Sequence, residues 1–235
     1  MKVLQKLMMI VALGLVLTTF AEAAQDIPFS GFFGNQTIYE QLQPGPKGGA
    51  KLRWVKQGVN PNKYNKFMVD SVIFFLANNA DYKGIDPQEM KELSDNFNKE
   101  IVAAFRNKYQ IVAEPGPDVA QIKIAITNIQ PSKPGVSAVT SIIPAGLGIS
   151  LVKKGASGGW SGSGQTCMEI MVLDSTTNET LILLIDQRKA EFEDRFTKWG
   201  SANDAFKLWS AKAVEFIDNS KRINRESSST TTDNY

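Results

Sequence analysis

The sequence has no histidine and a single cysteine, and each shortage removes a class of chemistry. Without histidine the chain cannot build a Ser-His-Asp or Cys-His catalytic centre, a histidine metal site or a histidine pH switch. A lone Cys167 excludes an intrachain disulfide and any cysteine-rich zinc or iron–sulfur site. Because Cys167 lies in an apolar run that is typical of a strand, we expect an inert thiol buried in the core.

The chain also lacks a large excess of either positive or negative charge. The chain carries 26 basic and 24 acidic residues, which gives a formal net charge of +2. This balance offers no electrostatic basis for binding nucleic acid or another polyanion. A chain of 235 residues with 43% hydrophobic content is long enough to bury a core of its own.

Residues 1–23 have the features of a secretory signal. Lys2 and Lys6 precede an uncharged stretch over residues 7–20, and Ala21 and Ala23 supply the small side chains that flank a cleavage site. The apolar stretch is shorter than the roughly 20 residues of a membrane-spanning helix. We therefore expect export, cleavage after Ala23 and a periplasmic protein.

The remaining chain divides by composition into three parts. Residues 24–50 are rich in Gly, Pro and Gln and predict an irregular arm lying on the domain. Residues 51–220 alternate between strand-like and helix-like patterns and predict one α+β domain. Residues 221–235 are polar and end in a Ser/Thr run, which predicts a disordered tail.

The patterning predicts a mostly antiparallel mixed sheet with two amphipathic helices packed on one face. Asp86 and Pro87 suit the start of one helix, which should end near residue 108, and Ser201 should cap the other. Asn178 suits a left-handed turn between two paired strands. The expected strands cover residues 52–56, 66–76, 109–113, 119–129, 165–173 and 181–186.

One segment is unusual because residues 135–152 carry no charge, and a Gly/Ser-rich stretch with one aromatic follows them. Three interpretations remain open: a buried crossover followed by a flexible loop, an exposed apolar element that binds a partner or builds an oligomer, or a membrane-touching segment. The candidate partner-contact residues in this region are Ile142, Ile143, Leu147 and Trp160.

The catalytic motifs in the chain are weak. Residues 155–159 match the G-x-S-x-G pattern around Ser157, but the histidine base that this chemistry uses is absent. A Ser-Lys pair with Lys153 or Lys154 is the remaining route to a hydrolase. We therefore expect no catalytic residue, no cofactor and no metal site.

An ordered set of stretches resembles the bacterial envelope family called domain of unknown function 3313. The stretches are LQPGPKGGA (42–50), PNKYNKFMVD (61–70), YKGI (82–85), IQPSKP (129–134), DQR (186–188) and KWG (198–200). Members are mostly lipoproteins, so the resemblance implies an envelope protein. Ala24 stands where a lipoprotein carries its acylated cysteine, so we expect a form without a lipid anchor.

These observations favour a non-catalytic periplasmic protein that acts as a binding or accessory module of a cell-envelope assembly. Its expected partner is another envelope protein, and a homo-oligomer is possible. Nucleic acid is not an expected partner, and membrane contact is a less favoured one. The alternatives are a hydrolase of unknown substrate and a membrane-interacting protein that uses residues 135–152.

Overall fold

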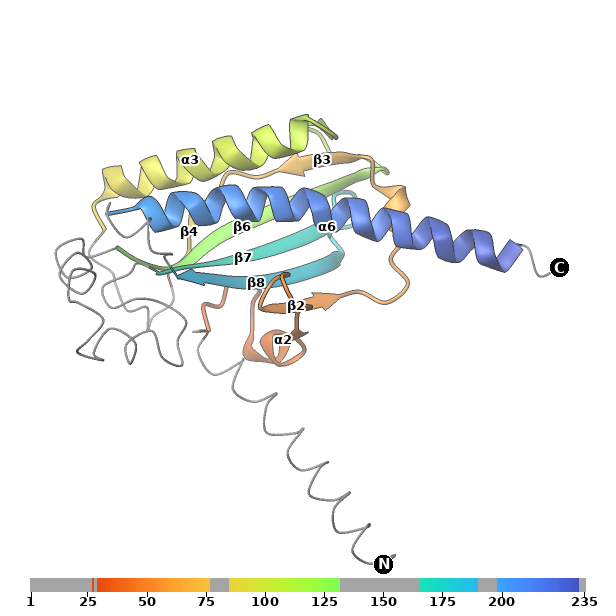
Figure 1. Cartoon of the computed structure of the whole chain (residues 1–235), viewed down its shortest axis with the longest axis horizontal. Coiled ribbons are helices and arrows are strands. Elements are labelled where there is room, and N and C mark those ends of the chain that lie inside the picture. The colour runs from red at the N-terminus through yellow and green to blue at the C-terminus, as the bar shows by residue number, and fades with distance from the viewer. Residues whose placement is uncertain (1–26, 28, 77–84, 132–164, 190–197, 233–235) are drawn as a thin grey trace, which may run out of the picture.

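The computed structural model describes residues 27, 29–76, 85–131, 165–189 and 198–232 (Figure 1). Its helices are α2 (Gln36–Glu40), α3 (Pro87–Arg106) and α6 (Gly200–Thr232), and a 3-10 turn covers Pro61–Lys63. Its strands are β1 (Gln43–Pro44), β2 (Leu52–Val55), β3 (Lys66–Val69), β4 (Ile73–Phe74), β5 (Gln110–Ile111), β6 (Val119–Gln130), β7 (Gln165–Asp174) and β8 (Thr180–Lys189).

All described strands belong to one sheet, in the order β1-β2-β8-β7-β6-β3-β5, with β4 beside β6. Strands β1, β2, β8, β7 and β6 pair antiparallel, whereas β3 and β4 run parallel to β6 and β5 runs parallel to β3. The predicted α+β class with a mostly antiparallel mixed sheet is therefore confirmed. The predicted hairpin is β7–β8, and Asn178 in its loop has the left-handed φ of 57°.

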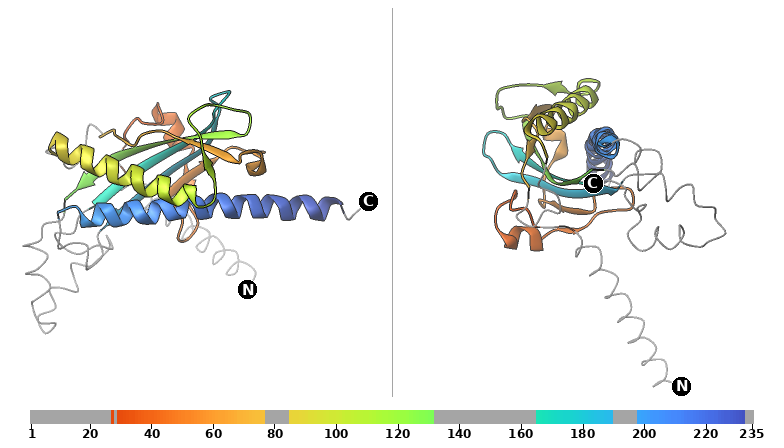
Figure 2. Two further views of the ribbon diagram at one scale, coloured as in Figure 1. Left: turned by 90° about the horizontal axis from the view of Figure 1, so that it is seen from above. Right: turned by 90° about the vertical axis from the view of Figure 1, so that its left-hand side faces the viewer.

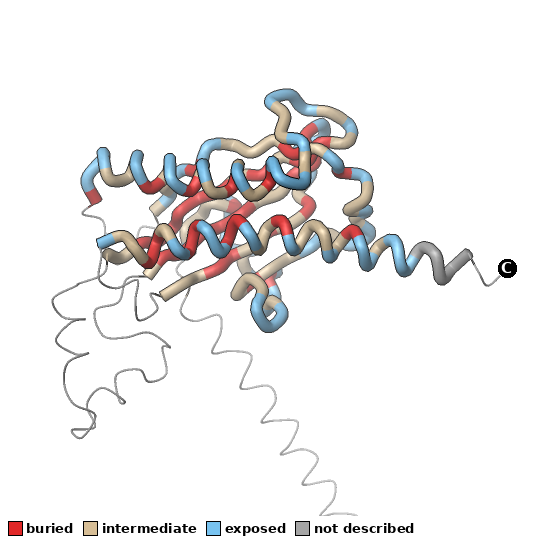
Figure 3. The backbone as a smooth tube through the Cα atoms, turned by 45° about the horizontal axis from the view of Figure 1, so that its top comes forward, coloured by how far each residue is buried: buried red, intermediate tan, exposed pale blue. Residues whose placement is uncertain are grey.

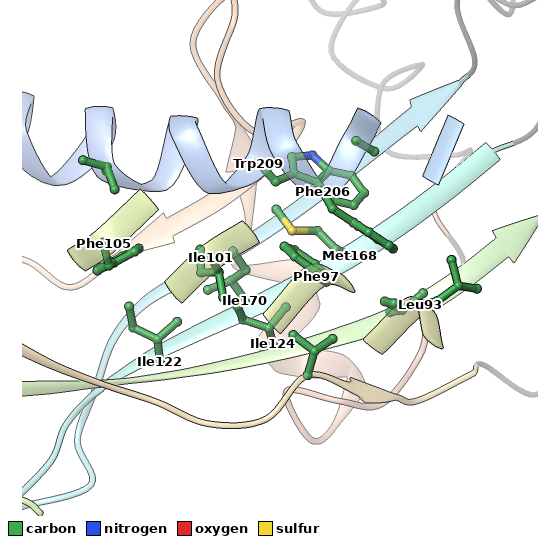
Figure 4. Close-up of a cluster of buried hydrophobic side chains, with 14 of the residues drawn as sticks. Leu93, Phe97, Ile101, Phe105, Ile122, Ile124, Met168, Ile170, Phe206 and Trp209 are labelled. Carbon is green, nitrogen blue, oxygen red and sulfur yellow. The ribbon is translucent and has the colours of Figure 1, made fainter. Parts of the chain in front are cut away.

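The two long helices cover the same face of the sheet (Figure 2). Helix α3 begins as predicted: Asp86 caps it by accepting a hydrogen bond from the Gln88 N–H at 2.8 Å, and Pro87 follows. Buried positions recur along α3 and α6 (Figure 3). Their side chains meet those of the strands in one core, where the Phe97 and Phe206 rings stack at 4.5 Å (Figure 4).

The opposite face of the sheet is covered by residues 29–42, the first part of the predicted arm (Figure 2), whereas the loop 46–50 reaches the helix side. The arm is not wholly irregular, because it contains α2 and the two-residue strand β1. Its Phe33 and Leu42 pack in a second apolar cluster with Leu52, Cys167, Leu183 and Ile185. Cys167 is fully buried there, and burial raises the pKa of its thiol to about 12, which fits the expected inert thiol.

The predicted strand over residues 66–76 is instead two short strands, β3 and β4. Between them the Asp70 carboxylate accepts hydrogen bonds from the Gln121 side-chain amide at 2.9 Å. The Val72 N–H donates to the Asn98 side chain of α3 at 2.9 Å rather than to a neighbouring strand. Competition from these side chains interrupts a sequence whose β-branched and aromatic residues favour one continuous strand.

Helix α6 differs from the prediction at both ends. It begins at Gly200, because the Trp199 carbonyl accepts from the N–H groups of Ala202 and Asn203 at 3.1 Å, so Ser201 lies inside the helix. It continues to Thr232, past the end of the sheet (Figure 1), which contradicts the predicted disordered tail over residues 221–232. The composition of that segment is polar, but Lys221 and Asn224 donate hydrogen bonds to the side chains of Asn65 and Asn60.

Candidate functional site

The predicted partner contacts lie outside the described residues. Ile142, Ile143, Leu147 and Trp160 fall within residues 132–164, and so does Ser157 of the weak nucleophile pattern. The candidate sites below therefore come from other parts of the chain: a buried carboxyl under the arm, an exposed aromatic edge and a cavity beneath α6.

Glu169 is the buried carboxyl, and its residue is 0% exposed in the middle of β7. The Tyr39 hydroxyl of α2 donates to its Oε2 at 2.6 Å, and the Ser30 hydroxyl lies 2.8 Å from the same tyrosine oxygen. Among the described residues Oε1 has no hydrogen-bond partner. The arm therefore covers this carboxyl and contacts it through Tyr39.

The surroundings of Glu169 oppose its ionisation. Burial raises the pKa of the Glu169 carboxyl, and the pKa of the Tyr39 hydroxyl is raised as well, first by burial and then by its hydrogen bond to Glu169. A protonated glutamic acid can donate a hydrogen bond as well as accept one. Neither cavity described below is lined by Glu169. We therefore assign this pair to fastening the arm onto the sheet.

The burial of Glu169 could have been predicted from its position in the sequence. An acidic residue in the apolar run over residues 166–173 must either break the strand or be buried with a partner. The partner could not be located, because Tyr39 lies 130 positions away in the chain.

The aromatic edge consists of Phe29, Phe32, Ile73 and Phe75. Phe29, Ile73 and Phe75 are 41%, 45% and 40% exposed, which is high for such large apolar side chains. Phe32 joins the arm to the end of β4, since its ring lies 5.8 Å from that of Phe75. The edge thus combines the arm with β4, which pairs with β6 alone among the described strands.

A cavity of about 350 Å³ lies between the sheet and the second half of α6. Side chains of β6, β7 and β8 form its floor, and α3 and α6 form its walls. The residues that line it are mostly apolar and include Ile122, Ile170, Leu184, Ala213 and Phe216.

A second cavity, of about 260 Å³, lies under α6 on the side of the loop 46–50. Ile170, Leu184, Ala213 and Phe216 line both cavities, so the two lie side by side beneath the helix.

Asp186 anchors α6 above this second cavity. The Trp209 indole N–H donates to Asp186 Oδ2 at 2.7 Å, and Arg188 Nε donates to the same oxygen at 2.8 Å. The Lys51 backbone N–H donates to Oδ1 at 3.0 Å. One carboxylate thus ties the helix, the strand β8 and the start of β2 together, so the cavity wall has a fixed position.

Two further kinds of feature are absent from the described residues. No helix there combines the length and apolar character that crossing a membrane requires. No three His, Cys, Asp or Glu side chains there are grouped as metal ligands would be.

Solved structures resemble the chain only distantly. A PelC dodecamer from Paraburkholderia phytofirmans matches at 9% identity and a TM-score of 0.38, over 68% of this chain and 96% of that one. A DUF330 protein from Xanthomonas campestris matches at 12% identity and 0.36, over 74% and 96%. A DUF4136 protein from Bacteroides thetaiotaomicron matches at 9% identity and 0.32, over 72% and 95%.

No curated protein matches the chain. The sequence model of one family, described as "Protein of unknown function (DUF3313)", matches residues 28–213. That range contains the whole sheet, α3 and the first part of α6. The match agrees with the family resemblance that the ordered sequence stretches indicate. The chain therefore belongs to the DUF3313 family.

Proposed function

We propose that this chain is a non-catalytic periplasmic protein that acts as an accessory module of a cell-envelope assembly by binding another envelope protein. The observation that carries the proposal is the aromatic edge. It places three large apolar side chains in water, Phe29 on the arm and Ile73 and Phe75 on or just after β4, a strand with an open side among the described residues. The secretory features of residues 1–23 support the location.

Exposed apolar side chains that cluster mark interaction surfaces more often than those that stand alone. Phe32 contacts both Phe33 and Phe75, at ring distances of 5.7 and 5.8 Å, so the arm and β4 present one continuous patch. Aromatic residues are enriched at the centres of protein interfaces, because they bury a large area and have few rotamers to lose. A partner that covers the patch would also cover the open side of β4.

The shape of the aromatic edge depends on the arm. Phe29 packs on Tyr39 with ring centroids 4.8 Å apart, and Tyr39 is the residue that donates to Glu169. The buried hydrogen bond from Tyr39 to Glu169 therefore helps to hold Phe29, the arm's exposed part of the surface that the partner would recognise. This connection makes the arm part of the binding site rather than a passive cover.

The proposal is tested by affinity purification of the tagged protein from its own host after mild crosslinking, with partners identified by mass spectrometry. The wild-type protein should recover a reproducible envelope protein. The double variant Ile73→Ser with Phe75→Ser should lose at least nine-tenths of it, because both exposed anchors are removed while the partly buried Phe74 stays packed against the core.

The matched control is Ile223→Ser, which removes a 59%-exposed apolar side chain far along α6. It should recover the partner at the wild-type level. Equal recovery by the double variant, or no envelope partner for the wild type, would overturn the proposal.

The location has its own test. The mass of the protein released from the periplasm should correspond to a chain that begins at Ala24. Material that stays in the cytoplasm with residues 1–23 attached would contradict the exported module.

A further inference from the structure

We propose that the two neighbouring cavities beneath α6 form one continuous path, here called the α6 tunnel, which binds a single acyl chain whose anionic headgroup lies at the mouth near Arg53. This inference goes beyond the proposed protein partner and does not depend on it. It assigns a ligand class to a site whose walls are apolar and whose mouth is basic.

The lining of the first cavity suits a hydrocarbon. Its floor is formed by the helix-facing side chains of β6, β7 and β8, including Ile122, Ile170 and Leu184. Ile101 and Phe105 of α3 form one wall, and α6 forms the roof. Polar residues lie mainly where α6 passes the end of the sheet. A ligand inside would therefore find few hydrogen-bond partners and would be held by burial of apolar area.

A small side chain stands in the lining that the two cavities share, and we infer that they connect there. Ala213 lies between Trp209 and Phe216 on the helix face that lines both cavities. A larger residue at this position would fill the point where the two cavities meet. An elongated ligand can thus run from the loop 46–50, under α6, to the wider cavity beyond.

Positive charge gathers at the second cavity and not at the first. The second cavity is lined by four basic side chains and two carboxylates. Lys212 pairs with Glu215 at 2.8 Å and Arg188 pairs with Asp186 at 2.8 Å, so both carboxylates already have cations. Lys47 and Arg53 form no ion pair with the described residues and supply the excess positive charge.

Arg53 is placed to meet a headgroup. It lies opposite Leu184 in the β2–β8 register, and cross-strand partners share a face of the sheet. Its side chain therefore rises from the floor beside a residue that lines both cavities. A guanidinium donates in a fork that matches the two oxygens of a carboxylate or phosphate.

The size of the wider cavity sets the length of the chain. A group of about the size of a water molecule takes about 30 Å³, so a cavity of about 350 Å³ holds on the order of a dozen carbon atoms. Dodecanoate is therefore the probe that fits the site in both length and charge.

The test is isothermal titration calorimetry of the full chain with dodecanoate and with dodecyltrimethylammonium, each below its micelle concentration. The two probes share the same alkyl chain and differ in the sign of the head. We expect dodecanoate to bind at one site and at least tenfold more tightly. Equal affinities, or no binding of dodecanoate, would overturn the proposal.

Two variants locate the ligand. Ala213→Phe should weaken dodecanoate binding at least tenfold because it blocks the tunnel, whereas Ala211→Phe, on the exposed side of α6, should not. Arg53→Glu should remove the preference for dodecanoate, whereas Lys99→Glu on the exposed side of α3 should keep it. If circular dichroism shows that Ala213→Phe is unfolded, the Arg53 comparison decides. Wild-type preference in Arg53→Glu would place the ligand elsewhere and contradict the inference.

Discussion

At the scale of single residues, two buried carboxyl groups of β7 have opposite surroundings. Glu169 lies under the arm, where the Tyr39 hydroxyl donates to it, and its pKa is raised by burial. Asp174 ends the strand, and its pKa is lowered, chiefly by the hydrogen bond from Lys63. The two groups therefore make the stability of the fold respond to pH in opposite directions.

Glu169→Gln should remove the part of the pH dependence of stability that comes from Glu169. The unfolded chain titrates Glu169 near 4.5 and the folded chain titrates it higher. The native state therefore holds more protons above pH 4.5, and its free energy of unfolding falls as the pH rises through the folded pKa. Relative to the Gln variant, the wild type should lose about 1.4 kcal/mol for each unit of the raised pKa.

Urea unfolding of both proteins between pH 4 and pH 8 measures this difference. Since glutamine does not titrate, the other ionisable groups cancel in the comparison. A difference in the free energy of unfolding that stays constant over the range would contradict the assigned role of burial.

Asp174→Asn should show the reverse dependence. The carboxylate accepts from Lys63 Nζ at 2.6 Å, from the Tyr64 hydroxyl at 2.9 Å and from the N–H groups of Thr176 and Thr177 at 3.0 Å. At pH 7 the variant should lose about 1–3 kcal/mol of unfolding free energy, because the buried Tyr64 hydroxyl and three more exposed donors lose a charged acceptor. The loss should shrink as the pH falls below 3.8, where the unfolded carboxyl is protonated. Denaturation at pH 3, 5 and 7 tests this, and equal stabilities at pH 7 would refute it.

At the scale of elements, local signals predicted some parts of the fold well. The start of α3 follows from Asp86 and Pro87, whose side chains act within one turn. The β7–β8 hairpin follows from two apolar runs and a turn that accepts Asn178 with positive φ. Each of these features is decided by neighbours in the sequence.

Elements decided by distant contacts were predicted less well. The break between β3 and β4 depends on Asn98 and Gln121, which come from α3 and β6. The end of α6 depends on Lys221, whose Nζ donates to the Asn65 side chain at 3.2 Å and lies 4.7 Å from the centre of the Tyr109 ring. A polar composition cannot reveal such partners, so the tail appeared to be disordered.

The end of α6 gives a prediction at this scale. Truncation after Ser220 removes Lys221 and also Asn224, which donates to the Asn60 side chain at 3.1 Å. The free energy of unfolding should fall by about 1–3 kcal/mol, since a partly buried cation–π contact and several hydrogen bonds are lost. Truncation after Ser227 is the control and should leave stability within about 0.5 kcal/mol. Chemical denaturation that finds the shorter chain as stable as the full one would restore the prediction of a disordered tail.

At the scale of the whole molecule, the sheet separates two faces that are covered by different elements. One face carries α3, α6 and the tunnel, and the other carries the arm and the buried Glu169. The sequence predicted the α+β class, the two helices on one face and the family. It did not predict the candidate sites, because the aromatic edge and the tunnel join residues from segments far apart in the chain.

The central claim is that the aromatic edge contacts an envelope protein, and site-specific photo-crosslinking in the native host tests it most directly. A benzoyl-phenylalanine in place of Phe75 should yield one discrete adduct with an envelope protein upon irradiation. The same probe in place of Ile223, which is more exposed but far along α6, should yield none. The absence of an adduct from the probe at position 75, or the same adducts from the probes at positions 75 and 223, would contradict the claim.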